Sequence, residues 1–156
     1  SRAVDAIVNS GRKDLRYFII GDGPDKMALI KQINENNVND VIKMLGEQEN
    51  PYRFMKNADY IFVPSFHEAA PMVYDEAGAL NIRIISTETT SAYEMLNEED
   101  IICENSYSGL LKTIRNIEKP KKAKQKKIFS KQRIQFIRLI EDSCIVSNVI
   151  IDGKND

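Results

Sequence analysis

The chain is poor in the residues from which metal centres and disulfides are built. Its 156 residues include no tryptophan, one histidine and two cysteines. Cys103 and Cys144 stand apart in apolar surroundings and not as a CxxC pair, which favours buried free thiols over a disulfide or a metal site. With His67 as the sole histidine a zinc site would lack ligands, so we expect no bound metal and no other cofactor.

Long apolar runs and a strong net charge are also absent. No apolar run reaches the roughly 18 residues of a membrane span, and no signal peptide opens the chain. The formal net charge is −1, so the charge of the molecule as a whole does not favour binding to nucleic acid. The sequence therefore predicts a cytoplasmic protein. Because it begins without Met and inside a helical pattern, we also expect it to be a piece of a longer protein.

Short apolar segments alternate with helical patterns over most of the chain. Segments rich in β-branched or aromatic residues predict strands at Leu15–Ile20, Val38–Leu45, Tyr60–Pro64, Ile82–Ser86 and Ile101–Cys103. Helical patterns separate them, and one opens with the capping-box spacing Ser91-Ala92-Tyr93-Glu94. Such alternation requires crossover connections and hence a parallel sheet with helices on both faces. The predicted fold is α/β, a Rossmann-like doubly wound domain over residues 1–118.

The carboxy-terminal part of the chain is strongly basic. Residues 119–156 are predicted to form a basic helix, over Lys121–Arg138, and a tail that packs on the domain. The basic side chains have three interpretations: a solvated face, contact with an anionic membrane surface, and contact with nucleic acid. Nucleic acid is the least favoured, because aromatic interleaving is limited to Phe129 and Phe136. The apolar end Ile145–Ile151 favours neither strand nor helix.

Two glutamates lie where the third predicted strand passes into a helix. Ligands of doubly wound sheets bind beyond the carboxyl ends of the strands. A helix that opens at Pro71 offers the free amides of Met72 and Val73, and with the helix dipole these form an anion site suited to a diphosphate. Glu68 precedes the helix and Glu76 lies more than a turn inside it, so both carboxylates flank this site and fit the hydroxyls of a sugar nucleotide. The alternative is that both glutamates are simply exposed.

Five motifs in one order resemble those of family 4 glycosyltransferases, which are retaining enzymes of the GT-B fold. The motifs are GDGP, LG, NPYRFMKNADYIFVPSFHE, the E-x7-E spacing and IISTETTSAYEML, and they cover roughly Leu15–Glu104. The resemblance implies the carboxy-terminal, donor-binding domain of an enzyme that transfers a sugar from a nucleoside diphosphate sugar to a hydroxyl acceptor. It also implies a place in polysaccharide or glycoconjugate biosynthesis, and no bound metal.

The resemblance implies roles for the residues around the predicted anion site. Glu68 would hold hydroxyls of the transferred sugar and is the candidate catalytic residue. Glu76 would bind the ribose, and the amides of Met72 and Val73 would bind the diphosphate. His67, which is adjacent to Glu68, would either touch the ligand or be incidental.

The resemblance also assigns two glycine turns to the donor site. Gly21 and Gly23 would let their loop approach the donor closely, although a plain turn explains both equally well. Gly46, Glu47 and Gln48 would bind the nucleobase, largely through backbone groups, and here the alternative is an ordinary loop.

The sequence departs from the family pattern in three places. Ala69 and Ala70 stand where the family commonly has glycine and an aromatic, so this loop has less backbone freedom. Thr89 and Thr90 stand where a glycine pair is common. The family's phosphate-binding Arg and Lys, and its acceptor domain, lie before the point where this sequence starts. We therefore expect half a site, completed by a missing amino-terminal domain, and no transfer by this chain alone.

A binding module without catalysis is the alternative function. A Rossmann-like domain can bind another nucleotide or serve only as an interaction module. The string GDGPDK lacks the third glycine of the dinucleotide fingerprint, which argues against a dehydrogenase.

Overall fold

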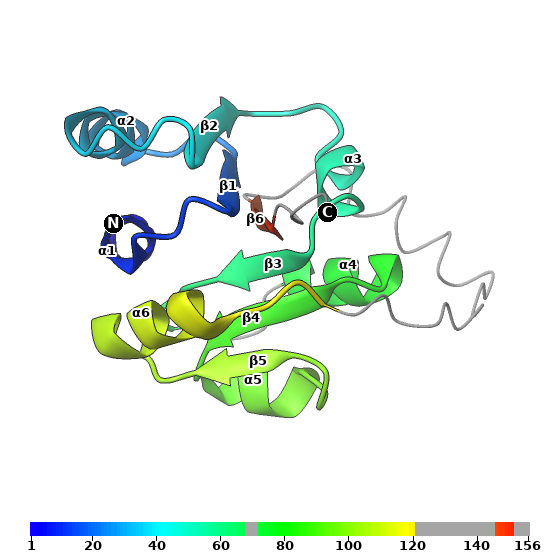
Figure 1. Ribbon diagram of the computed structural model, residues 1–156. Coiled ribbons are helices and arrows are strands. Elements are labelled where there is room, and N and C mark those ends of the chain that lie inside the picture. Colours follow the sequence, from blue (N-terminus) through cyan, green and yellow to red (C-terminus); the bar gives the residue numbers. More distant parts are fainter. Residues whose placement is uncertain (68–71, 121–145, 152–156) are drawn as a thin grey trace, which may run out of the picture.

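The chain folds into one sheet with helices on both faces (Figure 1). The computed structural model describes residues 1–67, 72–120 and 146–151. The helices are α1 (Arg2–Ser10), α2 (Lys26–Glu35), α3 (Tyr52–Met55), α4 (Met72–Leu80), α5 (Thr90–Met95) and α6 (Tyr107–Asn116). The strands are β1 (Leu15–Ile20), β2 (Ile42–Gly46), β3 (Tyr60–Val63), β4 (Arg83–Thr87), β5 (Ile101–Cys103) and β6 (Val146–Ile151).

Five of these strands run parallel, which confirms the predicted α/β fold. The strand order is β2-β1-β6-β3-β4-β5, with parallel pairing of β1 with β2, β3 with β4, and β4 with β5. The carboxyl ends of β1 to β5 therefore share one side of the sheet, called here the carboxyl edge. The opposite side is called the amino edge.

The sixth strand departs from the wholly parallel sheet that the sequence predicted. β6 is antiparallel to both of its neighbours, β1 and β3. Its first residue, Val146, is in register with Ile20 at the carboxyl edge, and its last, Ile151, is in register with Leu15. β6 therefore begins at the carboxyl edge and ends at the amino edge, opposite to the other five strands. The apolar end of the chain, for which the sequence favoured no structure, is thus a central strand.

Two apolar clusters form the core, one on each face of the sheet. The pleat of β3 separates them, because Tyr60 and Phe62 belong to one cluster and Ile61 and Val63 to the other. The first cluster contains buried residues of α1, α2 and α6, and the second contains buried residues of α3, α4 and α5. A strand that is apolar at every position fits this two-sided burial.

The predicted strand bounds are shifted by one residue at several ends, and two larger differences have a clear structural cause. The second strand begins at Ile42 and not at Val38, because Asn37 has a left-handed φ of 53° and the amide of Ile42 bonds back to the carbonyl of Val38. Helix α5 is capped by Thr89 and not by Ser91. Thr89 is extended, with φ −143°, and its hydroxyl accepts a hydrogen bond from the amide of Ala92.

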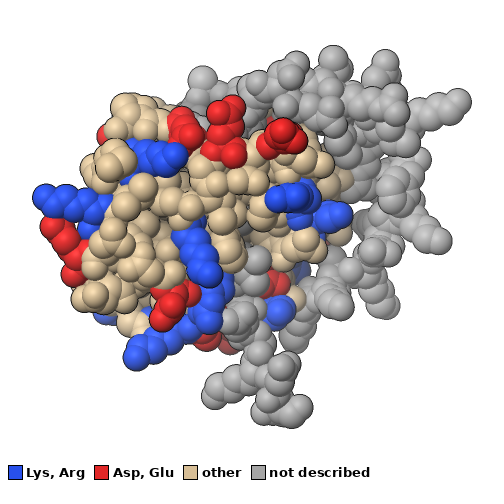
Figure 2. All heavy atoms as spheres, turned by 90° about the horizontal axis from the view of Figure 1, so that it is seen from above, with Lys and Arg blue, Asp and Glu red and all other residues tan. Residues whose placement is uncertain are grey.

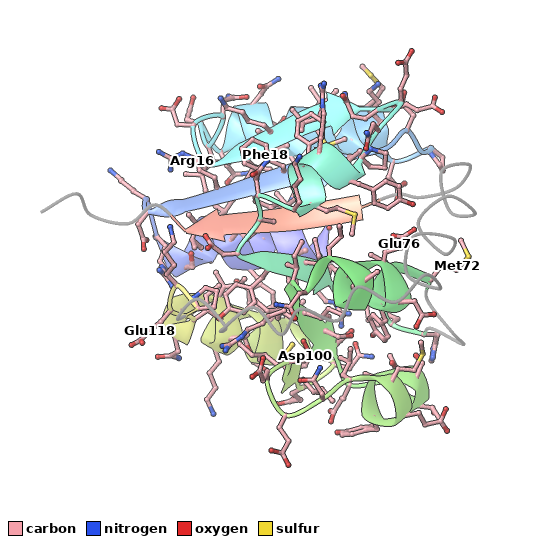
Figure 3. All side chains as sticks on the ribbon, turned by 90° about the vertical axis from the view of Figure 1, so that its right-hand side faces the viewer. Arg16, Phe18, Met72, Glu76, Asp100 and Glu118 are labelled. Atoms are coloured by element: carbon pink, nitrogen blue, oxygen red, sulfur yellow. The ribbon has the colours of Figure 1, made fainter. Side chains whose placement is uncertain are left out.

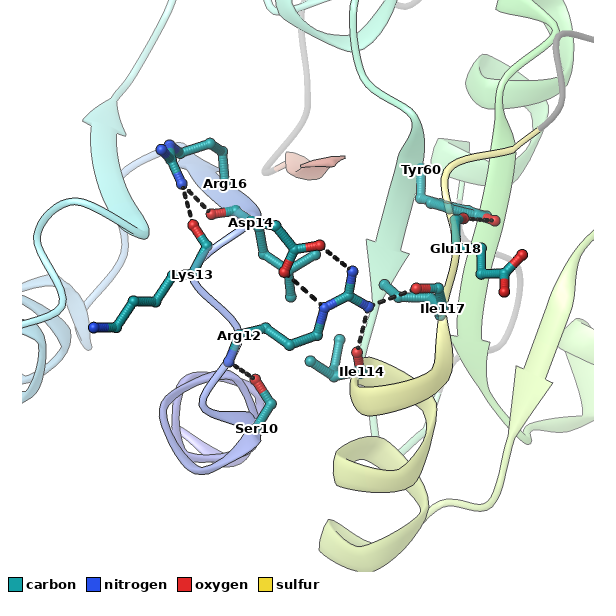
Figure 4. A network of polar contacts seen from close by, with 10 residues as sticks. Ser10, Arg12, Lys13, Asp14, Arg16, Tyr60, Ile114, Ile117 and Glu118 are labelled. Carbon is teal, nitrogen blue, oxygen red and sulfur yellow. Dashed lines mark hydrogen bonds and ion pairs between the residues drawn. The ribbon is translucent and has the colours of Figure 1, made fainter. Parts of the chain in front are cut away.

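The amino edge is closed by a network around Arg12 (Figure 4). The guanidinium donates to the carbonyls of Ile114 and Ile117 at 3.1 and 2.5 Å, at the end of α6, and to the carboxylate of Asp14 at 3.0 Å. Carbonyls at a helix end have no partner within the helix, so Arg12 satisfies groups that would otherwise be costly to bury. The hydrogen bond to Asp14 raises the pKa of the Arg12 guanidinium.

The predictions for the cysteines and the tail are tested only in part. Cys103 is a buried free thiol, as expected, and burial raises its pKa. Cys144 and the predicted basic helix over Lys121–Arg138 lie outside the described residues. The division of the chain at residue 118 therefore stays a prediction.

Candidate functional site

The loops that follow the parallel strands meet at the carboxyl edge, where the sequence placed the site. The two predicted glycine turns lie side by side there, because the amide of Gly21 donates to the carbonyl of Gly46 at 2.8 Å. Both residues have left-handed φ values, 117° for Gly21 and 66° for Gly46, which glycine adopts without the strain that most side chains would add. The loops that follow β1 and β2 are thus joined by a hydrogen bond.

The conformations and contacts of the other residues in these two turns do not point to a ligand. Gly23 is not left-handed, and a Cβ there would meet no atom within 4 Å, so its own conformation does not call for glycine. Asp22 forms an ion pair with Lys26, four residues further along the chain. Gln48 donates to the carbonyl of Leu45 at 2.7 Å, and Glu47 is exposed.

Glu76 is buried at this edge, with 1% of its surface exposed. It comes from the second turn of α4, and the Tyr52 hydroxyl donates to its Oε1 atom at 3.4 Å. Figure 3 shows Glu76 with Met72 on the side of the domain opposite to Glu118. The alternative that Glu76 is simply an exposed surface residue is therefore wrong. A carboxylate that is fully buried is costly unless it serves a partner or a ligand.

The start of α4 lies beside this carboxylate. Met72 is 46% exposed and Val73 is half-buried, so these two residues are accessible at the carboxyl edge. Tyr74 fixes the helix to the sheet, because its hydroxyl is 2.5 Å from the hydroxyl of Ser86 in β4. Glu68 and Pro71 lie outside the described residues, so the flanking of an anion site by two glutamates stays a prediction.

An arginine that the sequence did not single out organises the third loop. Arg2, at the start of α1, donates to the carbonyls of Pro64 at 3.1 Å and Asn105 at 3.2 Å. Its guanidinium also lies 3.6 Å from the ring centre of Phe66. The amide group of Asn105 donates to the carbonyl of Phe66 at 2.9 Å, which ties the loops after β3 and β5 together. No sequence signal marks Arg2, since basic residues are common near helix ends.

His67 is exposed at the end of this third loop. Between it and the rest of the described chain no hydrogen bond is formed. Its proximity to Glu68 in sequence therefore remains the only reason to place it at a ligand.

A cavity of 710 Å³ lies elsewhere, along β5 and α6. Cys103, Lys112 and Thr113 are among the residues that line it, together with Lys119 and Pro120. None of the lining residues belongs to α4 or to the glycine turns, so this cavity is separate from the candidate site.

The described residues show no single-sign charged face in Figure 2, no metal site and no membrane-spanning helix. Basic and acidic side chains are interspersed over the face that Figure 2 shows. Within residues 1–67, 72–120 and 146–151, no group of three His, Cys, Asp or Glu side chains could hold a metal ion. No helix in these same ranges is long and apolar enough to cross a membrane. The expectation of a metal-free site stays a prediction.

Comparison with known proteins decides the family. Residues 1–135 match the family described as Glycosyl transferases group 1. The chain belongs to this family. The resemblance seen in the ordered motifs is thereby confirmed, and the match covers the carboxy-terminal, donor-binding half of the GT-B fold.

Similar proteins come from three microorganisms. An uncharacterised glycosyltransferase of Methanocaldococcus jannaschii is 36% identical over 73 residues, which are 47% of this chain and 18% of that protein. The N-acetylgalactosamine-N,N'-diacetylbacillosaminyl-diphospho-undecaprenol 4-alpha-N-acetylgalactosaminyltransferase of Campylobacter jejuni is 28% identical over 123 residues, 74% of this chain and 34% of the enzyme. The N-acetyl-alpha-D-glucosaminyl L-malate synthase of Bacillus anthracis is 25% identical over 93 residues, 58% of this chain and 24% of the enzyme.

A solved structure supports the fold of this group 1 domain. Anabaena HepE, crystallised in complex with UDP and glucose, superposes with a TM-score of 0.62 at 16% identity, over 73% of this chain and 33% of the other. At that identity the match shows the fold alone. The chain spans about a third or less of the length of each of these relatives.

Proposed function

We propose that the chain binds a nucleoside diphosphate sugar at the carboxyl edge, as the donor-binding half of a retaining glycosyltransferase. The burial of Glu76 carries this proposal. A carboxylate with 1% exposure, held at a ligand-binding edge by Tyr52, is pre-organised to accept hydrogen bonds from a vicinal diol such as that of ribose.

The surroundings of Glu76 supply the other parts of a nucleotide site. The start of α4 offers backbone amides and the positive end of a helix dipole to a diphosphate. The joined turns at Gly21 and Gly46 present backbone groups without side chains, which suits close approach of a nucleobase and sugar. Glu68, in the loop before α4, would contact the transferred sugar.

Catalysis in this proposal is mainly stabilisation of the diphosphate leaving group. Amides at a helix start stabilise developing negative charge without any proton transfer. The acceptor and further cations would come from a second domain, so this chain alone transfers nothing. The names of the Campylobacter and Bacillus relatives, which transfer amino sugars to a lipid-linked sugar and to malate, support a hydroxyl acceptor in glycoconjugate biosynthesis. A lipid-linked acceptor would fit a cytoplasmic protein whose basic segment touches an anionic membrane.

Calorimetry with UDP, GDP and ADP sugars tests this proposal. We expect the wild-type chain to bind one of these classes with a dissociation constant on the order of a millimolar or below. Glu76→Gln should weaken that binding at least tenfold, because an amide replaces one acceptor oxygen by a donor. Glu94→Gln is the matched control, since Glu94 is an exposed glutamate on the neighbouring helix α5, and it should bind as the wild type does.

The outcomes separate the two parts of the proposal. Equal binding by the wild type and Glu76→Gln would contradict the ribose assignment alone. If the folded wild type binds none of the three nucleotide classes, the donor-binding function is wrong and a non-catalytic interaction module is favoured instead.

A further inference from the structure

The most exposed aromatic side chains of the described residues lie in three neighbouring connections. Phe66, 63% exposed, belongs to the loop after β3. Tyr93, 65% exposed, belongs to α5, which follows β4, and Tyr107, 40% exposed, opens α6, which follows β5. These three strands are adjacent in the sheet, so the connections are neighbours at the carboxyl edge (Figure 1). Exposed apolar side chains that gather in one place mark a contact site, whereas single ones are common on any surface.

Asn105 ties these connections together. Its side-chain amide donates to the carbonyls of Phe66 at 2.9 Å and Glu88 at 3.2 Å. Its backbone amide donates to the Oε1 atom of Glu88 at 3.3 Å, and the Tyr93 hydroxyl donates to the Oε2 atom of that carboxylate at 2.9 Å. Tyr107 follows Asn105 by two residues. Phe66, Tyr93 and Tyr107 therefore extend from one hydrogen-bonded unit, and they are called here the aromatic surface.

Arg2 leaves one face of the Phe66 ring available. Its guanidinium lies 3.6 Å from the ring centre, so it covers one face and holds the ring by a cation–π contact. Because most of Phe66 is nevertheless exposed, the other face is open to solvent. Both terminal nitrogens of the guanidinium donate to loop carbonyls, and its Nε atom is buried. This cation thus supports the ring and is not offered to an anionic ligand.

The polar groups beside these rings indicate the chemistry of a ligand. Glu88 accepts two side-chain hydrogen bonds, whereas a carboxylate has about four acceptor positions, so it can accept more from hydroxyl groups. Its negative charge disfavours phosphates and other anions. The Oδ1 atom of Asn105, in the same unit, is an acceptor without a hydrogen-bond partner among the described residues. Aromatic faces beside acceptors fit a neutral molecule with both C–H faces and hydroxyl groups.

We infer that the aromatic surface is a saccharide subsite, which binds the sugar part of the acceptor separately from the nucleotide. The C–H groups on one face of a pyranose ring are apolar and slightly positive, so they stack on the negative face of an aromatic ring. The hydroxyls of that pyranose would donate to Glu88. The subsite follows β3, β4 and β5, whereas the glycine turns follow β1 and β2, on the other side of β6. The assignment to the acceptor rests on the proposed function, but the binding of a saccharide does not.

Saturation-transfer NMR with simple glycosides tests this inference on the full chain. The probes are the methyl β-glycosides of glucose, galactose and N-acetylglucosamine. Cyclohexanol is the control, because it has an apolar ring but only a single hydroxyl. We expect at least one glycoside to bind with a dissociation constant of about 1–10 mM, and cyclohexanol to bind about tenfold more weakly. Irradiation of the aromatic protons should transfer saturation mainly to one face of the bound pyranose.

Substitutions in the aromatic surface test where the glycoside binds. Phe66→Leu and Tyr93→Leu each replace an exposed ring by a smaller apolar side chain, so the fold should be kept and glycoside binding should weaken about fivefold. Met27→Ala is the matched control, since Met27 is a strongly exposed apolar side chain of α2, on the β1 and β2 side of the sheet. This variant should bind the glycoside as the wild type does. Amide spectra show whether each variant is folded.

Three results would overturn the saccharide subsite. They are binding of cyclohexanol as tight as that of the glycosides, unchanged glycoside binding in both leucine variants, and no glycoside binding to the folded wild type.

Nucleotide binding separates the acceptor assignment from the subsite itself. We expect glycoside binding to persist when the chain is saturated with a nucleotide sugar. Displacement of the glycoside would overturn the acceptor assignment, because the aromatic surface would then hold the sugar of the donor. Glycoside binding by a chain that binds no nucleotide sugar would support the saccharide subsite and contradict the proposed function alone.

Discussion

Two arginines, one at each edge of the sheet, both donate hydrogen bonds to backbone carbonyls, but they hold different parts of the structure. Arg12 at the amino edge donates to two carbonyls at the end of α6 and also pairs with Asp14. Arg2 at the carboxyl edge also donates to two backbone carbonyls, but these belong to two separate loops, and its guanidinium lies on the exposed ring of Phe66. The first closes a helix end, and the second fixes the shape of loops around a site. Substitutions at the amino edge should therefore mainly lower stability, whereas substitutions at the carboxyl edge should mainly weaken ligand binding.

The largest expected loss of stability follows substitution of Arg12. Arg12→Met should lower the free energy of unfolding by about 2 kcal/mol, because two helix-end carbonyls and Asp14 lose a charged donor. Nucleotide binding should not change. Urea denaturation measures the first effect, and calorimetry measures the second. Arg115→Met is the matched control, since that exposed arginine makes one bond, to the carbonyl of Asn9, and should cost about 0.5 kcal/mol or less.

Substitution of Arg2 should give the opposite balance. Arg2→Met is expected to cost about 1 kcal/mol of stability, because two loop carbonyls lose a donor. Binding of the nucleotide sugar should weaken by about three- to tenfold, since the loop that leads to Glu68 loses its anchor. Unfolding and binding are measured on the same preparation. A larger loss of stability than that of Arg12→Met, with unchanged binding, would contradict the division between the edges.

Removal of the Tyr52 hydroxyl isolates the support of Glu76. Tyr52→Phe should weaken binding by about threefold, because the buried carboxylate loses a positioning donor. The cost in stability should be about 1 kcal/mol or less. Unchanged selectivity for the base would support a positioning role. A change in base selectivity would argue against this role.

The smallest expected effect is a loss of stability at high pH. Burial raises the pKa of the Cys103 thiol, so the folded state holds its proton more tightly than the unfolded state does. Stability from this group is complete below the unfolded pKa of about 8.5 and falls as the pH rises from there towards the folded pKa. Unfolding of Cys103→Ala should show a flatter dependence above that pH. An identical dependence in both proteins would exclude Cys103 as the cause.

The sequence could predict the parallel strands because each is an apolar run between turn residues. It could not place β6, since a six-residue β-branched segment carries no information about its partners or its direction. The same limit applies to α5. Thr89 and Ser91 both have hydroxyl groups that could cap the helix, and the cap is Thr89 because its backbone is extended. Local patterns thus determine which elements exist, whereas long-range pairing determines their arrangement.

The candidate site was predictable to the extent that motifs mark it. Gly21 and Gly46 meet because parallel strands bring their loops to one edge. The burial of Glu76 could not be read from spacing alone, because it depends on how α4 packs against the sheet and Tyr52. Arg2 was missed for a similar reason, since its contacts lie 62 and 103 residues away in the chain.

The most direct test of a donor site at the carboxyl edge is amide NMR of the wild-type chain during titration with a nucleotide sugar. Saturating addition of the diphosphate sugar that calorimetry selects should shift the amides of Gly21, Gly46, Val73 and Glu76. Those of Arg12 and Tyr60 at the amino edge should stay in place. Shifts centred on the amino edge, or on the cavity along α6, would contradict a donor site at the carboxyl edge.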